Sequence, residues 1–93
     1  MECIENILQE IEIGCLFDSH YVVDRMIGDF SDDYLRISQR IDPETKNLTL
    51  RAHQQIGHMI AKFKGTLVER QKAQSWSVNI HGNASSCALW KRI

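Results

Sequence analysis

The side chains best suited to chemistry form one polar face of a helix predicted over residues 50–64. Five basic or amide side chains fall there at i, i+3, i+4, i+7 and i+11, which places them together on a helix. They are Arg51, Gln54, Gln55, His58 and Lys62. Arginine pairs with guanine O6 and N7, and glutamine with adenine N6 and N7, so this face suits the base edges of the DNA major groove. An ordinary solvated helix face is the alternative, although such faces usually include glutamate and this one has none.

Other polar side chains in the second half of the chain could contact the DNA backbone. Lysine and arginine position a protein on the duplex through phosphate oxygens, without reading sequence. The basic candidates are Lys46, Lys64, Arg70, Lys72, Lys91 and Arg92. In the small, polar stretch 79–86, His81 and Asn83 could reach a phosphate or a minor-groove edge, but glycine and asparagine also suit a simple turn.

Charge is divided unequally along the chain although the formal net charge is only −1. Residues 1–45 hold eleven carboxylates and three arginines, a balance of −8. Residues 46–93 hold eight lysines and arginines against the single carboxylate of Glu69, a balance of +7. This asymmetry favours one surface for a polyanion and another that is kept away from it.

Catalytic and metal-binding patterns are not apparent in the sequence. Cys3, Cys15 and Cys87 are odd in number and lack metal-ligand spacing, with Cys87 remote from the other two, so we expect reduced cysteines and no zinc site. The run Asp18-Ser19-His20 contains the residue types of a hydrolase triad, but neighbours on one turn cannot face one another, so it is interpreted as a helix cap. No nucleotide-binding or metalloprotease motif occurs. We therefore predict a protein that is not an enzyme and has no cofactor.

Hydrophobic periodicity supplies the elements that would position these side chains. Helices are predicted over about residues 2–12, 19–30, 31–40 and 50–64, followed by strands near 66–70, 75–80 and 88–93. Asp18 or Ser19 would cap the second helix, and Thr49 the last. Trp76 and Trp90 are expected to pack in the core or against the sheet rather than to stack on bases.

This order of elements resembles the winged helix-turn-helix superfamily. The resemblance implies an α+β fold with three to four helices and a C-terminal β-hairpin, in which the last helix enters the groove and the hairpin forms the wing. The segment 14–17 resembles the first small strand of that fold. One departure is that residues 31–48 stand where the family has a short turn before its recognition helix.

Length and composition set the broad class. With 93 residues, 43% of them hydrophobic and 25% charged, the chain fits a single globular domain over residues 1–93. No apolar stretch is long enough for a membrane span, and Glu2 and Glu5 lie where a signal peptide would be basic, so a cytoplasmic protein is expected.

The leading hypothesis is a small regulatory protein that binds double-stranded DNA through residues 50–64. The acidic N-terminal half would then serve a homodimer contact or a protein partner. The alternative is a protein-interaction module, an adaptor or a small inhibitor, which uses its segregated charges without touching DNA.

Overall fold

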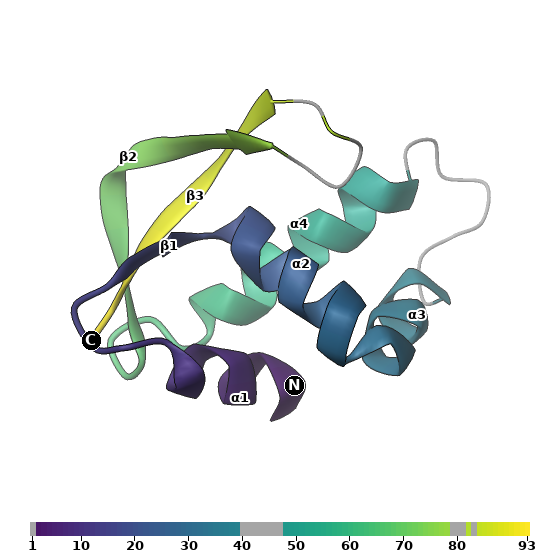
Figure 1. The fold of residues 1–93 in the computed structure, drawn as a ribbon, viewed down its shortest axis with the longest axis horizontal. Helices are drawn as coiled ribbons and strands as arrows, with labels where there is room; N and C mark the ends of the chain where they lie inside the picture. The colour runs from purple at the N-terminus through teal and green to yellow at the C-terminus, as the bar shows by residue number, and fades with distance from the viewer. Residues whose placement is uncertain (1, 40–47, 79–81, 83) are drawn as a thin grey trace.

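Four helices and a three-stranded antiparallel sheet form an α+β fold in the computed structural model, which describes residues 2–39, 48–78, 82 and 84–93 (Figure 1). The elements are α1 (Glu2–Glu10), β1 (Leu16–Asp18), α2 (Ser19–Asp29), α3 (Ser31–Gln39), α4 (Leu48–Ala61), β2 (Val68–Val78) and β3 (Ala84–Arg92). The sheet lies toward one end of the molecule and α3 toward the other (Figure 1). No helix among the described residues is both long and apolar enough to cross a bilayer.

The sheet contains one strand more than the predicted hairpin, because β1 pairs with β3 and gives the order β1-β3-β2. The strands predicted at 66–70 and 75–80 are joined in the single strand β2, whose register against β3 shifts between Arg70 and Gln74. Two extra residues on one strand of an antiparallel pair make that strand bend. The ribbon of β2 accordingly turns sharply along its length (Figure 1).

One buried cluster joins the helices to the sheet. The apolar stripe of α1 is fully buried at Ile4, Ile7 and Leu8, as its helical spacing predicts. The remaining members of the cluster on helices α2 to α4 are Val22, Val23, Met26, Ile37, Ala52, Ile56, Met59 and Ile60. Phe17, Val68 and Trp90 close the cluster from the three strands.

Helix ends follow local chemistry. Asp18 caps α2, since its backbone is extended and its carboxylate accepts a hydrogen bond from the Tyr21 backbone N–H at 2.9 Å. The helix predicted over residues 50–64 with Thr49 as its cap begins earlier, because α4 already starts at Leu48. α4 also ends at Ala61 rather than at residue 64, and the chain leaves it through Gly65 at a φ of +87°, a conformation that favours glycine.

Several burial expectations from the hydrophobic pattern are wrong. Ile27 on α2, Leu35 on α3 and Val78 on β2, each predicted on a buried face, are 36%, 54% and 59% exposed, and Trp76 on β2 is 71% exposed instead of packed in the core. Trp90 is 4% exposed, as expected. Trp76 is exposed because the opposite, serine-bearing face of β2 is the one that meets α2. Ile41 and Ile80, which the same hydrophobic pattern predicts on buried faces, lie outside the described residues.

Candidate functional site

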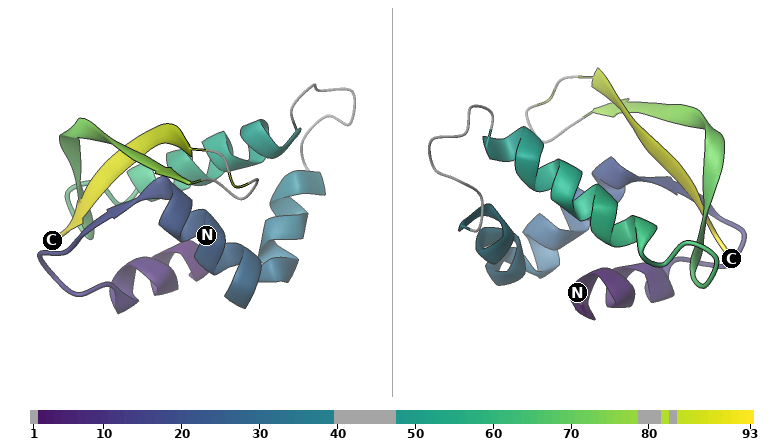
Figure 2. Two further views of the ribbon diagram at one scale, coloured as in Figure 1. Left: turned by 45° about the horizontal axis from the view of Figure 1, so that its top comes forward. Right: turned by 180° about the vertical axis from the view of Figure 1, so that it is seen from behind.

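The polar face of α4 lies on the surface of the molecule. In the right-hand view of Figure 2, α4 lies nearest the viewer, with the β2–β3 hairpin at the upper right. All five predicted contact residues are exposed: Arg51, Gln54, Gln55, His58 and Lys62, the last of them immediately after the helix end. The opposite side of α4 is buried, with Ile56 and Ile60 fully inaccessible. Packing therefore fixes which face of α4 is presented to solvent.

A contact with α3 supports α4 from the side. His53 is half-buried on α4, and its Nε2 lies 3.2 Å from the hydroxyl of Tyr34 on α3. Partial burial raises the pKa of the Tyr34 hydroxyl. The extra helix α3 thus packs against α4 without covering its polar face.

The remaining candidates for phosphate contact differ in their surroundings. Lys64, Lys72 and Lys91 are exposed. Lys46, His81 and Asn83 lie outside the described residues.

Arg70 and Arg92 are occupied by structural contacts. Arg70 donates to the Leu89 carbonyl at 3.3 Å, and its guanidinium lies 5.5 Å from the centre of the Trp90 ring. Arg92 donates through Nε to the Leu8 carbonyl at 2.8 Å, and through Nη1 to the Ile93 carbonyl. These contacts connect β2 to β3 through Arg70 and β3 to α1 through Arg92, and the phosphate role predicted for both residues stays a prediction.

A second polar site lies under the hairpin. Ser75 on β2 is directly opposite Cys87 on β3, and Ser77 is directly opposite Ser85. Residues paired in this way project from the same side of a sheet, as do residues two apart on one strand. Four small polar side chains therefore share one face of the hairpin, while Trp76 belongs to the other.

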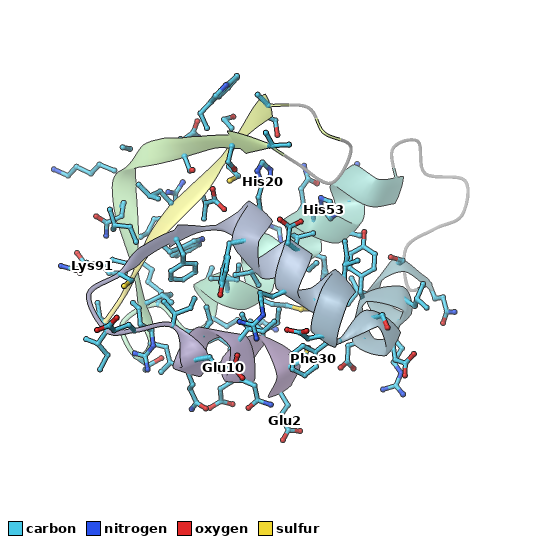
Figure 3. The ribbon with its side chains drawn as sticks, in the orientation of Figure 1. Glu2, Glu10, His20, Phe30, His53 and Lys91 are labelled. Atoms are coloured by element: carbon cyan, nitrogen blue, oxygen red, sulfur yellow. The ribbon has the colours of Figure 1, made fainter. Side chains whose placement is uncertain are left out.

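This polar face of the hairpin meets the first turn of α2. Asp18 accepts a hydrogen bond from the Ser75 hydroxyl at 2.8 Å. The His20 ring contacts both strands, with Nδ1 2.6 Å from Ser77 Oγ and Nε2 3.3 Å from Ser85 Oγ. The side chain of His20 extends from α2 toward the hairpin (Figure 3). Trp90 completes the contact by donating its indole N–H to Ser19 Oγ at 3.2 Å.

Asp18 is held in its ionised form. Partial burial alone would raise the pKa of its carboxyl, but the hydrogen bonds from Ser75, from the Tyr21 backbone and from Ser77 outweigh it, and the proximity of His20 acts in the same direction. The pKa of Asp18 is therefore below its usual value. A carboxylate with several donors is suited to orient a neighbouring group or to accept a cation.

Cys87 belongs to the same site. The ligand atoms of Asp18, His20 and Cys87 all lie within 4.8 Å of one another, and the three residues are half-buried. The sequence-based expectation that Cys87 lies far from other ligand-type side chains is therefore wrong, although the interpretation of Asp18 as a cap is confirmed. The signal in the sequence was the alternation of small polar residues at 75, 77, 85 and 87, which becomes meaningful only once the strand register is known.

Comparisons with protein families, with curated proteins and with solved structures found no match to this chain.

Proposed function

We propose that this protein is a small, regulatory DNA-binding protein of the winged-helix type, in which α4 enters the major groove and the β2–β3 hairpin is the wing. The observation that supports this most directly is the outer face of α4. It presents two cations, two amides and an imidazole to solvent, and α4 contains no carboxylate between Leu48 and Ala61.

The order of the elements supports the same proposal. A hairpin directly follows α4, and the short strand β1 between the first two helices joins the sheet. Both features are expected from the resemblance to winged-helix proteins. The departure at residues 31–48 corresponds to α3, Ser31–Gln39, which adds a helix between α2 and α4.

Different residue types would make different contacts with the DNA. Gln54 and Gln55 can read adenine, and Arg51 can read guanine. Lys62 and Lys64, at the C-terminal end of α4, can neutralise phosphates, and Lys72 and Lys91 on the strands can do the same. The carboxylates of the N-terminal half would keep that half away from the duplex through charge repulsion.

The test is binding to mixed-sequence duplex DNA at about 50–200 mM salt, where phosphate contacts make affinity fall steeply. The double variant Arg51→Ala with Lys62→Ala should lose at least about a hundredfold in affinity. It should also flatten the salt dependence, because Lys62 is assigned a phosphate contact and each such contact contributes roughly 0.9 to the slope. Thermal unfolding should change little, because both side chains are exposed.

The control is Arg36→Ala, which removes an exposed arginine from the acidic half of the chain. Its DNA affinity should equal that of the wild type. Unaltered affinity in the folded double variant would refute the assignment of α4 as the recognition helix.

A second function, protein interaction without DNA contact, is favoured by one observation. Trp76 and Val78 expose 71% and 59% of their surface on the outer face of the hairpin, and exposed aromatic side chains are frequent at protein interfaces. Absence of DNA binding at the lowest salt, together with self-association that Trp76→Ser abolishes, would establish this function instead. Sedimentation at several protein concentrations measures the self-association.

A further inference from the structure

We propose that Asp18, His20 and Cys87 bind one zinc ion between the start of α2 and the hairpin. The three side chains come from segments almost seventy residues apart in the chain, yet their ligand atoms lie within 4.8 Å of one another. They supply a carboxylate, an imidazole and a thiol, which are the three ligand types that zinc uses in proteins. The inference does not depend on DNA binding.

The geometry requires only small side-chain rotations. Zinc bonds of about 2.0–2.3 Å in a tetrahedron place neighbouring ligand atoms roughly 3.3–3.7 Å apart. The present separations exceed that by no more than about 1.5 Å, because 4.8 Å is their upper bound. Three protein ligands leave the fourth position of the tetrahedron to a water molecule.

The charges also fit a divalent cation. Asp18 supplies a carboxylate, which at its ordinary pKa is ionised at neutral pH. Binding would convert the Cys87 thiol to a thiolate and release its proton to solvent. A carboxylate and a thiolate together balance the two positive charges of zinc, and the thiolate favours zinc over magnesium or calcium.

The serines around the cluster already hold two of the ligands in place. The ring nitrogen of a zinc-bound histidine that does not bind the metal normally donates to an oxygen, which fixes the orientation of the ring. Ser77 Oγ, 2.6 Å from His20 Nδ1, fits this role. The metal would then bind through Nε2 in place of the longer, 3.3 Å contact with Ser85. Ser75 similarly orients Asp18, through a hydrogen bond of 2.8 Å.

A metal at this position would connect the helices to the hairpin. Asp18 and His20 lie at the junction of β1 and α2, whereas Cys87 is on β3. The pairing of β1 with β3 already joins Asp18 to this strand, and hydrogen bonds from half-buried side chains add to it. Zinc would thus restrict the movement of the hairpin relative to α2 and raise the stability of the folded chain in proportion to its occupancy.

The experiment is titration of the reduced, metal-free protein with Co²⁺, followed by displacement with Zn²⁺ in competition with a chromophoric chelator. One equivalent of Co²⁺ should produce a near-ultraviolet thiolate-to-cobalt absorption band and the visible bands of tetrahedral cobalt. Cys87→Ser and His20→Ala should each weaken Zn²⁺ binding by at least about a hundredfold, and Ser77→Ala by roughly tenfold, which is typical of a residue that orients a ligand. Asp18→Asn removes a charged ligand but keeps a residue that caps helices well.

Cys15→Ser is the matched control, because Cys15 is an exposed cysteine outside the cluster. It should retain the thiolate band and the wild-type affinity. Far-ultraviolet circular dichroism establishes that each variant is folded. Absence of a thiolate band in the wild type would overturn the proposal, as would a band that persists in Cys87→Ser or disappears in Cys15→Ser.

Discussion

His20 bridges α2 to the hairpin, with its Nδ1 2.6 Å from the hydroxyl of Ser77, a residue 57 positions later in the chain. The other nitrogen of the ring lies 3.3 Å from Ser85, so that one imidazole contacts both β2 and β3. Because Trp76, on the opposite face of the hairpin, is largely exposed, this end of the hairpin is held by polar contacts rather than by apolar packing.

Removal of the Ser77 hydroxyl should loosen the hairpin. Ser77→Ala is expected to lower the free energy of unfolding by about 1–2 kcal/mol, because a part-buried His20 nitrogen loses its partner. Amide hydrogen exchange should accelerate near Ser77 and Ser85. Ser86→Ala is the control, because Ser86 is exposed and pairs with Trp76 on the other face. Equal effects of the two substitutions would contradict the bridging role of His20.

Asp18 should make stability depend on pH in the acid range. A carboxyl whose pKa is lowered by folding stabilises the protein above its unfolded pKa of about 3.9, and that contribution is lost as the pH falls through the folded value. The wild type should therefore exceed Asp18→Asn in unfolding free energy at neutral pH, and the difference should shrink as the pH falls below the unfolded pKa and through the lower, folded one. Urea unfolding across this range measures it.

The control for the loss of one negative charge is Asp24→Asn, at an exposed position of the same helix. A difference between wild type and Asp18→Asn that stays constant with pH would show that ionisation of Asp18 contributes nothing to stability.

Two neighbouring cations on β3, Arg92 and Lys91, should contribute very differently to the free energy of unfolding. Arg92→Ala is expected to lower the free energy of unfolding by about 1.5–3 kcal/mol, because the guanidinium donates to the Leu8 carbonyl at 2.8 Å. Lys91→Ala should change it by less than about 0.5 kcal/mol, since Lys91 is exposed. Thermal and urea unfolding of both variants provide the comparison. Similar stabilities for the two variants would mean that the Arg92 contact has no energetic role.

The two tryptophans should be distinguishable by fluorescence. Trp76 is 71% exposed and Trp90 only 4%, so quenching by acrylamide in the wild type should come mainly from Trp76. Trp76→Ser should leave blue-shifted, poorly quenched emission and should change stability by less than about 0.5 kcal/mol. Trp90→Phe serves as the reciprocal variant. Strong protection of Trp76 in the wild type would indicate that another surface, such as that of a second copy, covers it.

Local periodicity predicted the helices and most of their buried faces, although Leu35 is exposed and α4 begins and ends earlier than expected. The spacing of Ile4, Ile7 and Leu8 identified the buried stripe of α1, because residues three and four apart share a helix face whatever surrounds them. The same rule placed the polar face of α4 outside. Asp18 was predictable as a cap because a cap bonds to an amide only three residues away.

The tertiary structure decided which face of the hairpin is inside and which side chains meet. An alternation of serine with Trp76 shows only that the two faces of a strand differ, and the usual assumption that the apolar face is buried failed because Asp18 and His20 lie beneath the serines. The approach of Cys87 to His20 depends on the register of β3, which sequence spacing does not specify. Whether Arg92 is available to a ligand depended likewise on backbone carbonyls brought to it from α1, a contact between residues 84 positions apart.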